Sequence, residues 1–250
     1  MQNAVLVGLS RQVALARELD VVANNIANMN TTGFKADGSL FEEFLNSAAR
    51  SSTNSRVSFV RDRATWTDMS GGPTERTGNA LDVAINGNAF FAVQTQRGVR
   101  YTRNGSFQIN PTGQLVTAEG DPVLGDGGPI TLQQTDRQIS ISADGTISVR
   151  EGKAITDSIR GKLKLVSFAD MSQLQKDGGA TFKYTGNGAP TDSTTSTVVQ
   201  GSLEKSNVRG VVEMSRMIEI TRNYTQIAAI LQQQHDMSQS AIDKLAEVPN

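Results

Sequence analysis

The chain has 250 residues, with 24 lysines and arginines against 25 aspartates and glutamates, and it contains no cysteine. The formal net charge of −1 gives no reason to expect a nucleic-acid partner, because phosphate binding requires concentrated positive charge. The lack of cysteine excludes disulfides, thiolate nucleophiles and cysteine-bound zinc. The first twenty residues have no basic start and carry a charge at Arg11. They predict neither a cleaved signal peptide nor a membrane span, and no lipid partner is expected.

The N-terminal segment, residues 1–35, is predicted to begin with a helix, because apolar residues recur at helical spacing from Val5 to Met29. Two sets of positions step by three or four residues: Leu6, Leu9, Val13 and Ala16, followed by Leu15, Leu19, Val22, Ile26 and Met29.

Four asparagines fall within seven positions near the end of this helix: Asn24, Asn25, Asn28 and Asn30. Asn30 or Gly33 is expected to end the helix, since both residue types tolerate the left-handed backbone of a helix C-terminus. Asn24 and Asn25 lie more than a turn earlier, where asparagine is a poor helix former. Amides beside an apolar seam can also hydrogen-bond a neighbouring helix and fix its register. A helix end and a surface that faces a partner are therefore both open interpretations.

Residues 36–77 are predicted to form an extended spacer with a short helix. Trp66, near Arg61 and Arg63, could stack on a base or a sugar. An aromatic residue packed within the spacer is the favoured interpretation.

From residue 78 the apolar period changes to two, as in Leu81, Val83 and Ile85. Turn sequences then follow about every ten residues, which is typical of a compact antiparallel β domain rather than of βαβ units. We therefore predict an antiparallel β domain over residues 78–168, with the sequence GKLKLVSF as its last strand.

One hairpin of this domain can be predicted in detail, because Asn-Gly at 104–105 favours a tight turn. A bulged three-residue loop at 103–105 places all four neighbouring apolar residues on one face. The predicted pairs are Tyr101 with Phe107 and Val99 with Ile109.

The end of the chain is predicted to return to helix after a loop-rich spacer at 169–205, in which Asp170 and Gln173 form a capping box. Residues 206–250 carry a heptad seam, and no proline between Pro190 and Pro249 interrupts a helix from about 208 to 247. The seam positions are Met217, Ile220, Tyr224, Ile227, Leu231, Gln234, Ser238, Ala241 and Leu245.

The predicted fold class is α+β with a mainly β core, in which the N- and C-terminal heptad helices form a coiled-coil-like layer and the central segment forms an antiparallel β domain. Long helices with an apolar stripe need a partner in water. The two seams are therefore expected to pack together, within one molecule or between molecules.

Signals for chemistry are weak, and we expect no enzyme activity, no catalytic, metal or cofactor site, and no small-molecule substrate. The single histidine, His235, is most simply a polar residue beside a helical seam, since a general base needs an oriented partner. Several aspartates sit in separate turns without the spacing of a calcium loop: Asp121, Asp126, Asp136 and Asp144.

Segments in three regions of the chain resemble the bacterial flagellar axial proteins, the family of rod, hook and hook-filament junction proteins. ANNIANMNTTGFK resembles the N-terminal signature, in which an Asn-Leu/Ile-Ala-Asn run precedes Thr-x-Gly-Phe-Lys, with Ile26 where leucine is usual. GNALDVAINGNAFFAVQ and YTRNGSFQINPTGQLVTAEGDPVLG are similar to the central β segments. QGSLEKSNVRGVVEMSRMIEITRNY resembles the C-terminal signature, in which Ser-Asn-Val opens the last helix. The N-terminal region looks most like the proximal rod type, with the distal rod type as the alternative.

The resemblance implies a structural subunit of the flagellar basal-body rod, a helical drive shaft that spans the periplasm and transmits torque. It implies other copies of the chain and neighbouring rod proteins as partners, and export by the flagellar type III apparatus without a cleaved signal peptide. A non-flagellar binding module on a coiled-coil stalk is the alternative outside the family. Asn25→Leu is expected to impair assembly while leaving the chain folded.

The assembly residues that the resemblance implies lie in the two signatures. In the N-terminal signature they are Asn24, Asn25, Ile26, Ala27, Asn28, Thr32, Gly33, Phe34 and Lys35. In the C-terminal helix they are Ser206, Asn207, Val208, Met217, Ile218, Arg222, Tyr224 and Leu231.

Overall fold

A computed structural model describes residues 2–46, 57–151 and 156–246, which divide into two compact units. Unit 1 comprises the described residues of Met1–Ala27, Asp37–Thr67 and Arg209–Asn250, and unit 2 comprises those of Asn28–Ala36 and Asp68–Val208. Two helices at the ends of the chain flank a strand-rich centre, which confirms the predicted α+β class. No helix in the described part of the chain combines the length and the apolar character needed to cross a membrane.

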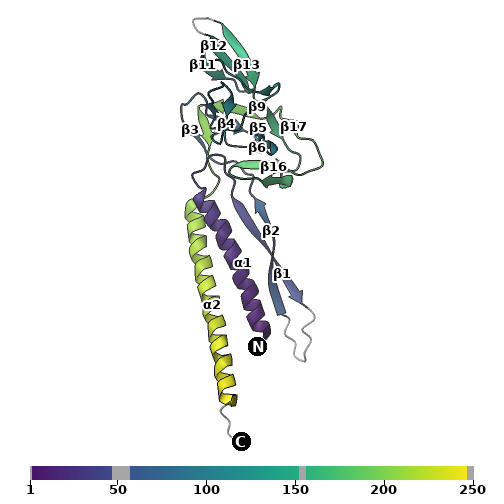
Figure 1. Cartoon of the computed structure of the whole chain (residues 1–250), viewed down its shortest axis with the longest axis vertical. Helices are drawn as coiled ribbons and strands as arrows, with labels where there is room; N and C mark the ends of the chain where they lie inside the picture. The colour runs from purple at the N-terminus through teal and green to yellow at the C-terminus, as the bar shows by residue number, and fades with distance from the viewer. Residues whose placement is uncertain (1, 47–56, 152–155, 247–250) are drawn as a thin grey trace. The chain divides into compact units, whose positions relative to one another are not determined.

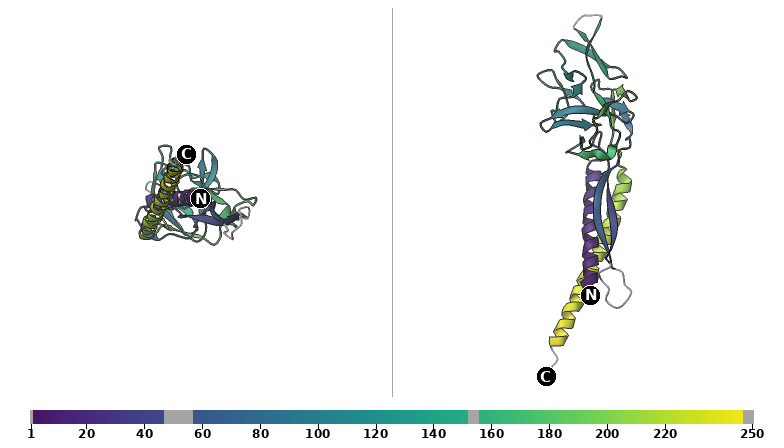
Figure 2. Two further views of the ribbon diagram at one scale, coloured as in Figure 1. Left: turned by 90° about the horizontal axis from the view of Figure 1, so that it is seen from below. Right: turned by 90° about the vertical axis from the view of Figure 1, so that its right-hand side faces the viewer.

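Unit 1 contains helix α1 (Gln2–Ala27), helix α2 (Gly210–Ala246) and a hairpin of strands β1 (Asp37–Asn46) and β2 (Val57–Thr67). Within this unit α1 lies between α2 and the hairpin (Figures 1 and 2). Helix α2 matches the predicted helix of about 208–247 to within two residues at each end, and α1 covers the predicted Val5–Met29 periodicity except for its last two residues. The terminal seams therefore pack together within one chain.

The described residues of the predicted 36–77 spacer form this hairpin and strand β3 (Thr74–Arg76), and none of them is helical. The strands of the hairpin are antiparallel, and Gly38 opposes Trp66 across them. A Cβ atom at Gly38 would lie 2.5 Å from the indole nitrogen of Trp66, so the glycine makes room for the ring. Residues 47–56 of the predicted spacer lie outside the described residues. The short helix therefore stays a prediction, whereas the hairpin was not predicted, because no local pattern reveals that β1 pairs with β2.

Unit 2 is built from antiparallel strand pairs. Its largest sheet has six strands in the order β15 (Leu174–Lys176), β16 (Thr181–Tyr184), β6 (Gly98–Thr102), β5 (Phe90–Thr95), β14 (Leu165–Ser167) and β17 (Thr191–Asp192). A second sheet has three strands, β11 (Asp136–Ile141), β12 (Thr146–Glu151) and β13 (Asp157–Lys162). The other strands form pairs: β4 (Val83–Asn86) with β18 (Thr197–Gln200), β3 (Thr74–Arg76) with β19 (Ser202–Glu204), β7 (Gln108–Ile109) with β8 (Leu115–Val116), and β9 (Leu124–Gly125) with β10 (Gly128–Pro129).

The core of unit 2 covers both faces of the six-stranded sheet. Alternate residues of a strand point to opposite faces, and Phe91 and Val93 of β5 belong to one buried cluster while Phe90 and Ala92 belong to the other. This explains why a continuous apolar run, rather than a strict alternation, follows residue 88.

The hairpin predicted around residues 101–107 is wrong. Strand β6 pairs with β5 and β16, and β7 pairs with β8, so the four apolar residues do not share a face. Phe107 is buried against Phe91, whereas Ile109 is 43% exposed. Gly105 serves a close backbone approach instead, because its carbonyl accepts from the amide of Val83 and a Cβ atom there would lie 1.7 Å from a backbone oxygen.

The return segment contains more strand than we predicted. Strands β15 to β19 lie within 169–205, and three of them, β15, β16 and β17, belong to the six-stranded sheet. The strand structure therefore continues past residue 168. The helical turn at Met171–Gln173 is capped by Asp170, whose carboxylate accepts from the amide of Ser172, as predicted. The side chain of Gln173 contacts the Asp170 carboxylate rather than closing a capping box.

Candidate assembly site

Asn25, near the end of α1, is held inside unit 1. Its side chain is 1% exposed. The amide nitrogen donates to the carbonyl of Asp37 at 2.8 Å, and the amide oxygen accepts from the Asp37 amide at 2.9 Å. These two hydrogen bonds resemble the pair that a residue of a neighbouring antiparallel strand would make with Asp37. They connect the helix to the start of β1. The side chain is therefore not available to a neighbouring subunit in this conformation.

The other residues around the end of α1 are more accessible. The helix ends at Ala27, before the Asn30 or Gly33 that we predicted, and a turn follows in which the Thr31 amide donates to the Asn28 carbonyl. Asn24 and Ala27 are exposed, and the remaining signature residues of this stretch are half-buried: Ile26, Asn28 and Thr32. An assembly role for these five residues stays a prediction.

Gly33 occupies a position that only glycine fits. Its φ angle is +68°, in the left-handed region. Its amide donates to the carbonyl of Glu204 at 2.8 Å, and a Cβ atom would lie 2.4 Å from the backbone nitrogen of Asn104. The left-handed glycine was foreseen, but it closes a turn of unit 2 rather than the helix.

Phe34 and Lys35 are buried in unit 2, with exposed fractions of 3% and 0%. The ammonium group of Lys176 lies 3.9 Å from the centre of the Phe34 ring and donates to the Lys35 carbonyl at 2.6 Å. The Lys35 ammonium donates to the carbonyl of Ser70 and to the carboxylate of Glu204, each at 2.6 Å. The side chain of Lys35 is thus a structural element of the fold.

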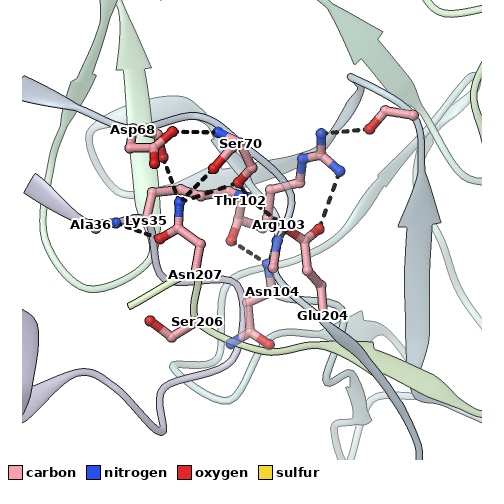
Figure 3. A network of polar contacts seen from close by, with 12 residues as sticks. Lys35, Ala36, Asp68, Ser70, Thr102, Arg103, Asn104, Glu204, Ser206 and Asn207 are labelled. Atoms are coloured by element: carbon pink, nitrogen blue, oxygen red, sulfur yellow. Dashed lines mark hydrogen bonds and ion pairs between the residues drawn. The ribbon is translucent and has the colours of Figure 1, made fainter. Parts of the chain in front are cut away.

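Glu204 receives two buried cations, as Figure 3 shows. Besides Lys35, the guanidinium of Arg103 donates to its carboxylate at 3.2 Å and to the carbonyl of Gly87 at 2.6 Å. Burial lowers the pKa of Lys35 and that of Arg103, and Glu204 opposes both shifts. Two cations share one carboxylate, so this group of three side chains carries a net positive charge when all are ionised.

Sequence reasoning missed Glu204 and Arg103. Both lie in segments that carry the family resemblance, Glu204 two residues before Ser206 and Arg103 beside the Asn-Gly pair. A charged residue in a predicted strand is the local signal, but it does not identify a partner 101 residues away.

Asn207 binds two other segments of unit 2 through its side-chain amide (Figure 3). Its oxygen accepts from the amide of Ala36 at 2.7 Å, and its nitrogen donates to the carbonyl of Asp68 at 2.9 Å and towards that of Ser70 at 3.3 Å. The hydroxyl of the buried Ser206 accepts from the amide of Val208 at 3.2 Å. The two predicted signatures therefore meet inside unit 2.

Helices α1 and α2 pack antiparallel in unit 1. A Cβ atom at Gly8 would lie 2.7 Å from Cδ2 of Leu231, and the guanidinium of Arg216 lies 2.7 Å from the carboxylate of Glu18. The α1 residue number falls as the α2 number rises, which fixes the opposite directions. Because glycine has no Cβ atom, Gly8 allows the side chain of Leu231 to lie close to the backbone of α1.

The remaining candidates are spread around α2 and the residues before it. Leu231, Met217, Tyr224 and Val208 are half-buried, and Ile218 and Arg222 are exposed. Among the described side chains of α2, only Ile220 is buried. The predicted C-terminal set therefore contains both packing residues and surface residues. His235 is exposed.

The exposed face of α1 changes character along the helix. Val5, Leu6, Leu9 and Val13 are 43–51% exposed. Further along, the exposed positions include Arg17, Asp20 and Asn24, which are polar. On α2, exposed apolar residues recur along its whole described length: Val211, Val212, Met214, Ile218, Ile230, Met237 and Ile242. Trp66 and Leu40 add exposed apolar surface on the hairpin, at 54% and 47%. Trp66 lies against Gly38 of the spacer, in line with the favoured interpretation, but about half of its surface remains exposed.

Groups typical of metal or catalytic sites are not gathered anywhere in the described ranges: no three histidine, aspartate or glutamate side chains lie close enough to hold a metal ion.

Comparison with known protein families accounts for the segments that form these structures. Residues 6–35 match the family described as flagella basal body rod protein, and residues 84–149 match the flagellar hook protein FlgE/F/G D1 domain. Residues 199–244 match the flagellar basal body rod FlgEFG protein C-terminal region. Lys35, Arg103 and Glu204 each come from a different matched segment, so their contacts join all three.

Three relatives match the chain over nearly its whole length. The flagellar basal-body rod protein FlgF of Caulobacter vibrioides is 42% identical over 99% of this chain and all of the relative. FlgF of Mesorhizobium japonicum is 36% identical over 98% of both chains. The rod protein FlgG of Bacillus subtilis is 29% identical over 97% of this chain and 99% of the relative. The chain therefore belongs to the FlgF-like family of flagellar basal-body rod proteins.

Proposed function

We propose that the protein is a structural subunit of the flagellar basal-body rod, which assembles helically with copies of itself and with neighbouring rod proteins to transmit torque. The observation that carries this proposal is the apolar surface of unit 1. Large side chains on α1 and α2 remain about half exposed or more, at helical spacing, after the two helices have packed on each other. Covering apolar surface stabilises an assembly by about 25 cal/mol per Å².

The geometry favours contacts between subunits over a ligand site. Exposed large apolar side chains gathered on one unit are typical of protein–protein interfaces. Contacts that differ on the two partners produce an open helical assembly rather than a closed ring. A rod carries load and needs no turnover, so we propose a structural role without enzymatic activity, cofactor or small-molecule substrate.

Location and export follow from the same proposal. The relatives are named as basal-body proteins, and we propose that this chain occupies the part of the rod that spans the periplasm, after export by the flagellar type III apparatus. The signatures that include Asn24, Asn28 and Ile218 are proposed to contribute contacts to neighbouring subunits. The residues Asn24 and Ile218 are exposed in the single chain, and Asn28 is half-buried.

The decisive experiment places a charge on the apolar half of α1. Leu9→Glu should leave the monomer folded, because Leu9 is 51% exposed, and should abolish rod assembly by burying an unpaired carboxylate between subunits. Far-UV circular dichroism reports the fold, and electron microscopy of isolated basal bodies together with swimming assays reports assembly.

The matched control adds the same charge to α1 at another exposed position, Ala23→Glu. We expect this variant to assemble and swim. Normal basal bodies in the Leu9→Glu strain would contradict the proposed use of this surface, whatever the control shows.

A further inference from the structure

Four residues near the C-terminal end of unit 2, Glu204 to Asn207, form hydrogen bonds with three other segments of that unit. The segments are residues 33–36, residues 68–73 and Arg103, and they are far apart in the sequence. We call residues 204–207 the clamp. Helix α2 begins at Gly210, three residues after the clamp ends.

The first half of the clamp works through Glu204. Its backbone carbonyl accepts from the amide of Gly33 at 2.8 Å. Its carboxylate accepts from Lys35 at 2.6 Å, from the amide of Gly72 at 3.0 Å and from Arg103 at 3.2 Å. Four donors from three segments therefore converge on one residue that is 2% exposed.

The second half of the clamp works through Lys205 and Asn207. The amide of Lys205 donates to the carbonyl of Pro73 at 2.9 Å. The Asn207 amide group accepts from Ala36 at 2.7 Å and donates to Asp68 at 2.9 Å. Ala36 and Asp68 also bond to each other, since the Asp68 amide donates to the Ala36 carbonyl at 2.8 Å. One side chain thus joins the points where two segments leave unit 2.

We infer that the clamp resists mechanical force that pulls α2 away from unit 2. A pull along the chain from Gly210 reaches Asn207 first and then Glu204, the last residue of strand β19. Because their hydrogen bonds run to three segments, the bonds stretch together and not one after another. Bonds loaded together share the force, and each carries a fraction of it.

The chemistry of the clamp suits this role. Charge-assisted bonds, such as those of Lys35 and Arg103 to Glu204, are about twice as strong as neutral ones. A buried ion pair adds little net stability but requires its own partners. The clamp therefore contributes more to the barrier against separation than to the free energy of folding. This inference rests on the proposed function only for its use in the cell, where the rod carries torque.

The test pulls on single full-length molecules in optical tweezers. Since the chain contains no cysteine, Glu119→Cys in unit 2 and Gln226→Cys on α2 provide two unique, exposed attachment points. Asn207→Ala should shorten the lifetime of the first rupture at constant force by tenfold or more. Asn207→Asp keeps the acceptor for the Ala36 amide but loses the donor, so it should give an intermediate lifetime.

Gln200→Ala is the matched control. The Gln200 amide also makes three backbone bonds in unit 2, accepting from Ile141 and donating to Ala80 and Ile139, but it lies outside the clamp. Both alanine variants should lower the denaturant midpoint similarly, and only Asn207→Ala should shorten the rupture lifetime more than twofold. Equal lifetimes for the two variants would overturn the inference.

Swimming in media of increasing viscosity separates the clamp from the proposed function. Asn207→Ala cells should swim in dilute medium and stop at a lower viscosity than Gln200→Ala cells. A shortened rupture lifetime with unchanged swimming would leave the clamp intact as a mechanical device and contradict the torque-carrying role. An unchanged lifetime would reject the clamp itself, whatever the cells do.

Discussion

The two units of this chain solve the problem of apolar surface in opposite ways. In unit 2, two buried clusters cover both faces of the main sheet. In unit 1, only four of the described side chains are buried: Ala14, Val22, Asn25 and Ile220. Thirteen of the seventeen large apolar residues that are exposed in the described chain belong to unit 1.

The difference teaches that unit 2 is complete as a single chain, whereas unit 1 is shaped for further contacts. In a pair of helices with one hairpin, each helix has neighbours on only part of its circumference. Apolar side chains on the remaining part stay exposed to solvent. A sheet covered on both faces encloses its side chains without help. The expected consequence is that substitutions in unit 2 act on folding, and most of those on the surface of unit 1 act on assembly.

The largest effect on stability is expected from Glu204→Gln in unit 2. This change leaves Lys35 and Arg103 buried without a counter-charge, which costs about 3–5 kcal/mol of the free energy of unfolding. Lys35→Met should cost only about 1 kcal/mol, because it leaves Glu204 and Arg103 as a neutral pair. Guanidinium unfolding followed by far-UV circular dichroism measures both.

These two variants sharpen the comparison, because they separate charge balance from packing at one place. If Lys35→Met destabilised unit 2 as strongly as Glu204→Gln, the lysine would matter for its packing and hydrogen bonds, and the excess positive charge would be irrelevant.

A smaller effect is expected from Asn25→Leu, the exception within unit 1. The change removes the two buried hydrogen bonds to the backbone of Asp37, at a cost of about 1–3 kcal/mol. Trp66 is the single tryptophan and lies in β2, so its fluorescence follows the unfolding of unit 1. Ala23→Leu is the control, since it introduces the same side chain at an exposed position of α1. It should leave the midpoint of the Trp66 unfolding transition unchanged.

This prediction differs from the one made on sequence grounds, which left the Asn25→Leu chain folded and placed the defect in assembly. If Asn25→Leu left the unfolding transition of Trp66 unchanged but abolished assembly, the interpretation made from the sequence would be correct. Asn25 would then act on assembly, like the surface residues of unit 1.

The smallest effect is expected from acid on unit 2. Arg160 donates to the carboxylate of Asp136 at 2.8 and 2.6 Å, and these bonds lower the pKa of Asp136. A carboxyl group with a lowered folded pKa stabilises the fold above its ordinary value of 3.8, and this stability is lost as the pH falls through the folded pKa. Arg160→Met should therefore weaken the dependence of stability on pH below about 4.

Acid titration of the wild type and the variant, followed by far-UV circular dichroism, measures this dependence. Arg150→Met is the control variant in the same three-stranded sheet. It removes a guanidinium from a more exposed ion pair, the one with Asp157. An unfolding midpoint that moved equally in both variants would show general charge effects instead of the Asp136 pair.

The predictable parts of the fold were those with a repeating pattern. Leu15, Val22 and the 3-4 steps of α2 identified both helices, and the change to a period of two identified the strand-rich centre. Gly33 was also predictable as a left-handed residue, because few other residues adopt that backbone. What remained hidden was pairing. The 37–67 hairpin and the partners of β6 depend on contacts between segments whose local sequences are compatible with several neighbours.

For the candidate site, the sequence identified the segments that carry the family signatures. It did not identify the contacts that the residues of these segments make. Asn25 and Lys35 stood out by type and by family resemblance, and both were assigned to assembly. The structure places each inside one chain, bound to Asp37 and to Glu204 respectively. Burial of a polar residue is decided by what packs around it, and no spacing along the chain records that.

The sequence by itself determined the two terminal helices, the strand-rich centre and the family, because helix and strand periods and signature motifs are local properties. Only the tertiary structure decided which polar residues are internal and which apolar residues stay exposed. It gathers Lys35, Arg103, Glu204 and Asn207 in unit 2 and leaves Leu9 and Ile218 at the surface of unit 1. The physical reason is that burial and ion pairing depend on distances in space, which the chain sets only when distant segments meet.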